Sequence, residues 1–366
     1  MGRHAAAYVP GHVKALSLNF WLLVALVAVF LVTSTMTYAQ NCEQCVSSGA
    51  PENPVMASEW AIKKQVNEVN VLFVAAKGNR FIGDLSRSDI TVRDDNKVPA
   101  AILGFRTEKD LPLRVALLID TSDSLTSRFR FEQVAASAFL RQSLSRVSDQ
   151  AFVMGFSDHQ KLMQDFTHDP DLLAQGVDRL KLGGGTALYD AVRASCQELL
   201  RHPEEDVVAR VLVILSDGQS NGGTLHLEDA VDFAQRAGVT VYSISTHPPV
   251  IPRDMDDPAG VEGNRNLRRL AEQTGGRVLF PESPKELGKA FEKITEELRN
   301  RYAISYRPAG FSNDGRYRTI AIEARKEGKR LQVRARKGYY ARQPYWNDEP
   351  EDKAPSALSS QLTPTN

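Results

Sequence analysis

An unbroken apolar run ends at a carboxylate in the first half of the chain. Val115–Ile119 contains only Val, Ala, Leu and Ile, and Asp120 follows at once. A strand with no polar position on either face is typical of a parallel sheet that helices cover on both sides. Ser122 and Ser124 come next at alternate positions, and a helix is predicted from Arg128 to Val147. The polar cluster therefore lies where a buried strand leads into a helix.

The chemistry of this cluster has two interpretations. A carboxylate and two hydroxyls supply three oxygen ligands, which suits a hard divalent cation. Asp, Ser and Thr are also preferred helix N-caps and turn residues. Taken alone, the Asp-x-Ser-x-Ser spacing fits a local capping role equally well.

Two later stretches carry the same kind of polar group at the same kind of place. In residues 182–190, a glycine run delivers the hydroxyl of Thr186 to the start of another predicted helix. Residues 211–218 form a second apolar strand, which ends at Asp217. In open α/β sheets, ligands bind outside the carboxyl ends of the strands. Three separate loops of this kind favour a cation site over independent helix caps.

With these three loops the chain resembles the von Willebrand factor A (VWA) domain, of the type found in secreted bacterial VWFA-related proteins. That family has a metal-ion-dependent adhesion site built from Asp-x-Ser-x-Ser, a later Thr and an Asp at the end of the next central strand. The resemblance implies Mg²⁺ or Mn²⁺ as cofactor, and a protein partner whose Asp or Glu carboxylate completes the coordination. It implies that the hydroxyls contact the cation and that the two carboxylates balance its charge. The predicted metal residues are Asp120, Ser122, Ser124, Thr186 and Asp217.

Strand-like and helix-like segments alternate from residue 111 to residue 300, which we predict to be one domain. Such alternation specifies an α/β fold, here a Rossmann-like, doubly wound and mostly parallel sheet with helices on both faces. We expect an edge strand at Leu162–Phe166 and helices that include Ala187–Leu200 and Asn266–Thr274. Residues 247–264 are rich in Pro and Asp, so we expect an exposed loop there.

Short alternating segments on both sides of this domain predict β structure. Residues 60–110 and 301–341 together supply about six strands, whereas neither stretch alone makes a convincing core. We therefore predict a small β-sandwich-like domain that flanks the VWA-like domain; the alternative is an extension that pairs onto the main sheet. The Lys and Arg residues between positions 316 and 337 are interpreted as the solvent side of a half-buried sheet. Binding of polyanionic material by these residues is the alternative interpretation.

The first 39 residues have the order of a secretory signal peptide. Basic residues up to Lys14 precede the apolar stretch Phe20–Val32, and the small-residue positions Thr37 and Ala39 follow. We predict export and cleavage after Ala39, so the protein is expected to be secreted or to reside in the cell envelope. The alternative is an uncleaved membrane anchor, because Ala15–Val32 approaches the ~20 residues that a membrane helix needs.

Two further stretches have few large apolar side chains. Residues 40–59 are predicted to be a linker and residues 342–366 a disordered tail. The linker carries Cys42 and Cys45, for which a local disulfide or an intermolecular link fits an exported chain. Cys196 is interpreted as a small buried hydrophobic residue of a helix.

Composition and motifs favour binding over catalysis. Lys and Arg together number 45, as do Asp and Glu, so no net charge indicates nucleic acid or a membrane surface. The chain contains no His-Glu-x-x-His, no P-loop and no Gly-x-Ser-x-Gly motif. We predict a non-enzymatic binding or adhesion protein that engages a partner carboxylate through the cation. The alternative function is a structural surface or assembly protein in which the metal only stabilises the fold.

Overall fold

The computed structural model describes residues 68–123, 129–201, 204, 207–247 and 257–341. All of them belong to one compact unit. Ser124, Cys42, Cys45 and the predicted signal, linker and tail lie outside the described residues.

A six-stranded sheet forms the centre of the α/β part of the chain. Its strands follow the order β10-β9-β8-β5-β6-β7, and all neighbouring pairs are parallel except β6 and β7. The predicted Rossmann-like, mostly parallel fold is therefore confirmed, and β7 is the antiparallel edge strand. The bounds are β5 Leu113–Asp120, β6 Gln150–Phe156, β7 Gln160–Thr167, β8 Ala209–Ser216, β9 Val239–Ser245 and β10 Val278–Leu279.

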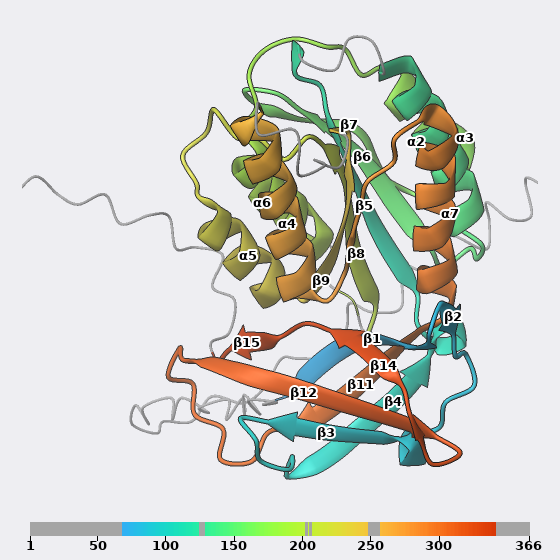
Figure 1. Ribbon diagram of the computed structural model, residues 1–366, viewed down its shortest axis with the longest axis vertical. Helices are drawn as coiled ribbons and strands as arrows, with labels where there is room; N and C mark the ends of the chain where they lie inside the picture. The colour runs from blue at the N-terminus through green and yellow to red at the C-terminus, as the bar shows by residue number, and fades with distance from the viewer. Residues whose placement is uncertain (1–67, 124–128, 202–203, 205–206, 248–256, 342–366) are drawn as a thin grey trace, which may run out of the picture. The chain divides into compact units, whose positions relative to one another are not determined.

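Helices cover both faces of this sheet (Figure 1). One face carries α2, α3 and α7, whose buried side chains share a core with the sheet; α4, α5 and α6 cover the other face with a second core. This arrangement explains why the inner strands have no polar face. The bounds are α2 Phe129–Ser143, α3 Pro170–Asp178, α4 Leu188–Arg201, α5 Leu227–Arg236, α6 Pro258–Thr274 and α7 Pro284–Arg299.

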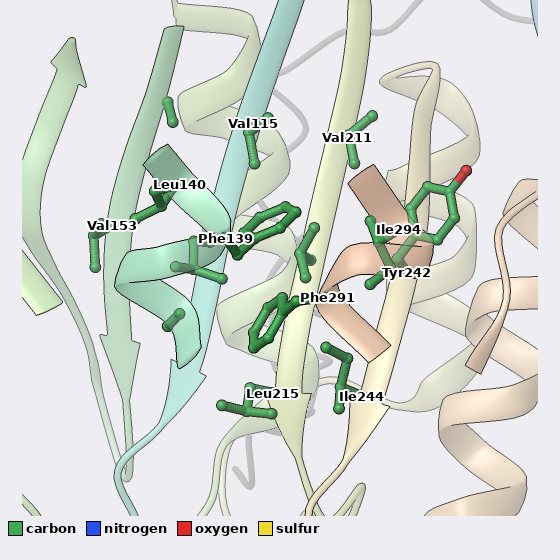
Figure 2. Close-up of a cluster of buried hydrophobic side chains, with 14 of the residues drawn as sticks. Val115, Phe139, Leu140, Val153, Val211, Leu215, Tyr242, Ile244, Phe291 and Ile294 are labelled. Carbon is green, nitrogen blue, oxygen red and sulfur yellow. The ribbon is translucent and has the colours of Figure 1, made fainter. Parts of the chain in front are cut away.

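The core under α2 and α7 is centred on two aromatic rings. Phe139 of α2 and Phe291 of α7 stack with their ring centroids 4.9 Å apart, and both are almost fully buried. Figure 2 shows these rings among branched side chains of the sheet, including those of Val115 and Val211. Large apolar groups thus fill the space between the two helices and the sheet.

The prediction of a loop over residues 247–264 is wrong for the C-terminal part of this range, because α6 begins at Pro258 rather than at Asn266. The side chain of Asp257 accepts a hydrogen bond from the amide of Gly260 at 2.9 Å and so caps the helix. The backbone nitrogen at the first helical position has no hydrogen-bond partner within the helix, so proline, which lacks the N–H group, is tolerated there. An Asp-Pro pair therefore starts a helix as readily as it marks a loop. The helix α2 likewise ends at Ser143, short of the predicted Val147.

Strands from both sides of the α/β part form two further sheets. In the first, β1 lies between β14 and β11, and β4 pairs with the far side of β11. In the second, β12 pairs with β3, β13 and β15. None of the described strands between residues 69 and 107 pairs with the central sheet. The bounds are β1 Val69–Lys77, β2 Arg80–Phe81, β3 Ile90–Asp94, β4 Ala101–Thr107, β11 Arg301–Arg307, β12 Tyr317–Lys326, β13 Lys329–Arg330, β14 Gln332–Ala335 and β15 Gly338–Tyr340.

These two sheets enclose a common core, as in a sandwich. Val71 and Ile304 of the first sheet share an apolar cluster with Ile320 of the second. A buried polar group also joins the sheets: Asp94 of β3 accepts hydrogen bonds from the hydroxyls of Tyr306 and Tyr339, at 2.8 and 2.9 Å. Hydrogen bonds of this kind satisfy a carboxylate that would otherwise destabilise the core.

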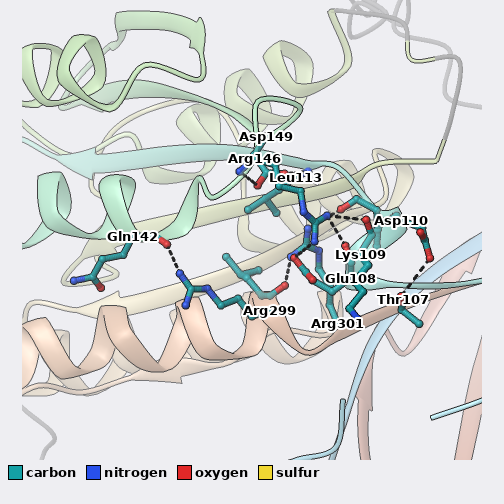
Figure 3. Close-up of polar contacts among 12 residues, drawn as sticks. Thr107, Glu108, Lys109, Asp110, Leu113, Gln142, Arg146, Asp149, Arg299 and Arg301 are labelled. Atoms are coloured by element: carbon teal, nitrogen blue, oxygen red, sulfur yellow. Dashed lines mark hydrogen bonds and ion pairs between the residues drawn. The ribbon is translucent and has the colours of Figure 1, made fainter. Parts of the chain in front are cut away.

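Polar contacts join the α/β part to the segments that enter and leave it (Figure 3). The Arg146 guanidinium pairs with Glu108 at 2.6 Å, and Asp149 accepts a hydrogen bond from the amide of Leu113 at 3.0 Å. The buried Arg301 donates to the carbonyl of Leu111 at 2.7 Å, and burial lowers the pKa of Arg301 to about 10. The base of β5 is therefore held on both sides by charged hydrogen bonds.

A buried carboxylate links α7 to the first flanking sheet. Glu297 has no exposed side-chain surface; it forms ion pairs with Arg277, at 2.5 Å, and with Arg334 of β14. Arg336 donates to the carbonyls of Gln235 and Asn70. The interpretation of the basic stretch as a solvent face is therefore wrong for Arg334 and Arg336, since their charges are used in internal contacts.

The stacked rings lead to a prediction about stability. Phe139→Ala should lower the free energy of unfolding by about 3–5 kcal/mol, because it leaves a cavity against Phe291. Phe131 is on the same helix but 55% exposed, so Phe131→Ala should change stability by only about 0.5 kcal/mol. Urea unfolding of both variants checks this, and equal losses would contradict the packing described here.

The buried ion pairs lead to a second prediction. Glu297→Ala leaves Arg277 and Arg334 without their shared carboxylate, and should lower the free energy of unfolding by about 3–5 kcal/mol. The neighbouring Glu296 is exposed, so Glu296→Ala serves as the matched control with little expected change. Urea unfolding again provides the measurement, and a Glu297→Ala protein as stable as the control would rule out the proposed link.

Candidate metal centre

The predicted metal residues lie where the strand order of the central sheet reverses. Starting from β5, the chain adds β6 and β7 on one side and β8, β9 and β10 on the other. Asp120 is the last residue of β5, and Asp217 directly follows the end of the neighbouring β8. In open α/β sheets the reversal leaves a crevice beyond the strand ends, because the loops diverge there.

Asp120 is a fully buried carboxylate at the point where the strand order reverses. One of its oxygens accepts a hydrogen bond from the amide of Ser122 at 2.9 Å, and the other accepts one from the hydroxyl of Ser216 at 2.7 Å. Burial raises the pKa of Asp120 to about 6, and the negative charge of Asp217 contributes to the rise. The carboxylates of Asp120 and Asp217 therefore repel each other at a site that is shielded from water.

The glycine run before Thr186 lies against the first loop. The amide of Gly183 donates to the carbonyl of Thr121 at 2.8 Å, and the amide of Asp123 donates to the carbonyl of Gly184 at 3.4 Å. Gly184 has φ +94°, and a Cβ atom there would lie 2.5 Å from a carboxylate oxygen of Asp158. The left-handed backbone favours glycine at this position, and the absence of a side chain lets the run lie against the loop that carries Asp158.

Thr186, which follows the glycine run, is hydrogen-bonded to the loop after β8. Its amide donates to the side-chain oxygen of Asn221 at 2.8 Å, and its carbonyl accepts from the amides of Asn221 and Gly222, both at 3.0 Å. Asp217 accepts a hydrogen bond from the amide of Gln219 at 2.9 Å, which shapes the start of this loop. Hydrogen bonds thus connect all three predicted loops.

The helix α6 closes one side of the centre. A Cβ atom at Gly218, where φ is +80°, would lie 2.2 Å from the carbonyl oxygen of Gly263 in α6. The two glycines let the helix pack directly on the turn that follows Asp217. The unpredicted first turns of α6 therefore have a structural role beside the metal centre.

The structure places four of the five predicted residues on adjoining loops at one edge of the sheet. Ser122 and Thr186 are 3% and 5% exposed, and Asp217 is half-buried. Ser124 lies outside the described residues. That these side chains hold a cation stays a prediction.

Three supporting residues were not found by sequence reasoning. The hydroxyl of Ser216 donates a hydrogen bond to Asp120. The sequence feature that could have indicated this residue is its position, as a polar residue at the end of an otherwise apolar strand. Asn221 accepts from the amide of Thr186, and Asp158 accepts from the amide of Gly185 at 2.9 Å. These two lie in loops without periodic spacing, so only the tertiary structure reveals their contacts.

The side chains at the centre fit a hard divalent cation. Among the described residues, no three His, Cys, Asp or Glu side chains form a metal-binding group, so the donors are two carboxylates and hydroxyls. Oxygen donors suit Mg²⁺ or Mn²⁺ better than zinc. In the described part of the chain, the hydrogen-bond donors to Asp120 are a backbone amide and hydroxyl groups rather than a basic side chain. A divalent cation would therefore offset the charge that Asp120 and Asp217 bring together.

Comparison with known proteins identifies this part of the chain. Residues 115–293 match the model of the von Willebrand factor type A domain. These residues form a VWA domain. The human collagen alpha-1(VI) chain is 25% identical over 181 residues, which are 43% of this chain and 17% of that protein. This chain thus spans a small part of the length of that relative.

Solved structures of low identity are also similar to the chain. The vWF domain of the type V pili tip protein Mfa5 from Porphyromonas gingivalis is 14% identical, with a TM-score of 0.41, over 51% of this chain and 94% of that one. A von Willebrand factor type A protein from Catenulispora acidiphila is 12% identical, with a TM-score of 0.43, over 67% and 71%. The pilus adhesin SpaC from Lactobacillus rhamnosus GG is 9% identical, with a TM-score of 0.43, over 69% and 48%.

The environment of Asp120 predicts how the cation-free VWA domain responds to pH. The pKa of Asp120 rises from 3.8 to about 6 on folding, so the folded protein binds this proton more tightly than the unfolded chain does. The resulting stabilisation, ~3 kcal/mol at most, is fully present below about pH 4 and is lost as the pH rises through about 6. Urea unfolding in EDTA between pH 4 and 7.5 measures this loss.

Asp120→Asn serves as the control, because it cannot ionise and should lack this part of the pH dependence. If wild type and Asp120→Asn lose stability in parallel between pH 4 and 7.5, Asp120 does not titrate as its burial implies.

Proposed function

We propose that the VWA domain binds a protein partner through a divalent cation, Mg²⁺ or Mn²⁺. The observation that carries this proposal is the convergence of Asp120, Ser122, Thr186 and Asp217 on hydrogen-bonded loops where the strand order reverses. Ser124 belongs to the proposed set because of its place in the Asp-x-Ser-x-Ser motif. The proposed role is binding, without catalysis.

Each side chain has a distinct part in this proposal. Asp120 and Asp217 balance the charge of the cation, and Ser122, Ser124 and Thr186 offer neutral hydroxyl oxygens. When bound, the cation supplies an electrophilic position for one more anionic oxygen, which an Asp or Glu of the partner would provide. Ser216 and Asn221 hold Asp120 and the Thr186 loop in place, the usual role of groups that surround metal ligands.

The proposed setting is the cell envelope or the extracellular space, with a role in adhesion or assembly. It is supported by the signal-like first 39 residues together with the VWA domain. Within the described part of the chain, no helix has the length and apolar character needed to cross a membrane. An uncleaved N-terminal segment would anchor the protein, and the intact mass of the exported protein distinguishes the two forms.

A second candidate function is a structural protein in which the cation only stabilises the fold. The observation that favours it is the complete burial of Asp120, whose two oxygens both accept hydrogen bonds inside the domain. A cation bound only to the folded state raises the melting temperature in either case. The two candidates differ in whether removal of the cation changes the affinity for a partner.

Cation binding itself gives a direct prediction. Calorimetric titration with Mn²⁺ and Mg²⁺ should show one site in wild type and none in Asp120→Ala, because a charge-balancing carboxylate is lost. Ser216→Ala should weaken the affinity by about 10–100-fold, since Asp120 loses a hydrogen bond that orients it. Ser195 is a buried serine of α4 that donates to the carbonyl of Ala191, so Ser195→Ala should bind like wild type.

Equal affinity in wild type and Asp120→Ala would refute the metal centre. Where the cation does bind, capture of partners from the native envelope fraction with and without EDTA decides between the two functions. Capture that EDTA abolishes and that Mg²⁺ restores supports metal-bridged binding. Capture that Asp120→Ala leaves unaltered supports the structural role.

A further inference from the structure

A small apolar notch opens between the N-terminal ends of α2 and α7. It has a volume of about 390 Å³, including its open mouth. Apolar side chains contributed by α2, by α7 and by the segment before α7 form most of its exposed lining: Phe131, Pro281, Pro284 and Leu287. A notch of this size has room for one large side chain rather than for a helix.

Two of the four polar residues that line the notch are hydrogen-bonded inside the protein. The hydroxyl of Ser245 donates to the side-chain oxygen of Asn264 at 2.6 Å, and the hydroxyl of Ser283 accepts from the amide of Glu286 at 3.3 Å. Glu132 is almost fully buried. What the notch offers to a ligand is therefore mainly carbon surface.

Apolar surface continues outside the notch along α2. Phe131 is 55% exposed, and Val134 is 57% exposed one turn later on the same side of the helix. Most large apolar side chains of the VWA domain are buried, so two adjacent exposed ones are unusual. Exposed apolar surface that adjoins a cavity is typical of interaction sites.

The notch lies close to the proposed metal centre. The amide of Thr246, one of its lining residues, donates to the carbonyl of Ser216 at 3.0 Å. The hydroxyl of Ser216 donates to Asp120 at 2.7 Å. Ser216 therefore contacts both a lining residue of the notch and a carboxylate of the proposed metal centre, so the two sites are near enough for a single bound segment to reach both.

The opposite flank of the metal centre has a different character. The groove between α5 and α6 is lined mainly by polar and charged side chains, and an ion pair between Arg269 and Glu228, 2.8 Å apart, bridges the two helices. Its lining is more polar than that of the notch. An apolar group of the partner is therefore better matched on the side of α2 and α7.

We propose that the notch receives a large apolar side chain from the same partner segment that supplies the carboxylate to the cation. The partner is then a peptide segment in which Leu, Ile, Met or Phe stands within a few residues of an Asp or Glu. This inference rests on the proposed function and specifies its partner. Burial of one such side chain should tighten binding by about 10–100-fold.

A displayed library of random linear peptides, panned on the immobilised full chain in MgCl₂ and eluted with EDTA, tests the proposal. The eluted peptides should combine an acidic residue with a large apolar residue at a preferred spacing. Synthetic copies should lose affinity about tenfold when that apolar residue is changed to Ser, and by a similar factor for Phe131→Ser or Val134→Ser. Both substitutions are at exposed positions, and melting temperatures confirm that the variants fold.

Val147→Ser is the matched control. Val147 is 81% exposed and lies near the start of β6, at the end of the sheet opposite the metal centre, so its substitution should leave the peptide affinity unchanged. Equal losses for Val147→Ser and Phe131→Ser would overturn the notch as a specific site.

The other outcomes separate this inference from the proposed function. Acidic peptides that elute with EDTA but show no apolar preference, or that bind Phe131→Ser and Val134→Ser as tightly as wild type, overturn the notch and leave the metal-bridged function intact. Peptides that stay bound in EDTA, are recovered afterwards with acid and depend on Phe131 overturn the metal-bridged function while the notch remains an apolar site. A library that yields no binding peptide overturns both.

Discussion

The buried carboxylate of Asp120 is the group around which the upper edge of the VWA domain is arranged. Its two oxygens are held by the amide of Ser122 and the hydroxyl of Ser216, and these bonds join the first loop to the end of β8. Among the described residues Asp120 has no basic partner, and its burial raises its pKa. The fold tolerates this group because the parallel sheet and its helices hold the surrounding backbone in place.

That support extends to the opposite end of the domain. Glu297 joins α7 to the flanking β structure through Arg277 and Arg334, while Arg146 and Arg301 hold the base of β5. Both sets of contacts combine a charged group with partners far away in the sequence. The proposed metal centre therefore lies on a frame that is fixed at its far end, so the loops at the strand ends can vary without loss of the sheet.

The two flanks of the proposed metal centre differ in polarity. Apolar surface at Phe131 and Leu287 lies on the side of α2 and α7, and charged side chains such as Arg269 line the side of α5 and α6. A cation alone recognises any accessible carboxylate, so selectivity has to come from the surface around it. Under the proposed function, the difference between the two flanks is the feature able to provide that selectivity.

The amino-acid sequence by itself determined the alternation of strands and helices and the placing of Asp120 and Asp217 at strand ends, because apolar periodicity and strand termini are local properties. It also carried the capping signal Asp257-Pro258, although the prediction missed the start of α6 there. Only the tertiary structure decided that β8 lies beside β5, that Ser216 reaches Asp120 across 96 positions and that Asn221 holds Thr186. Such contacts depend on which strands become neighbours, and no local pattern of residues encodes that choice.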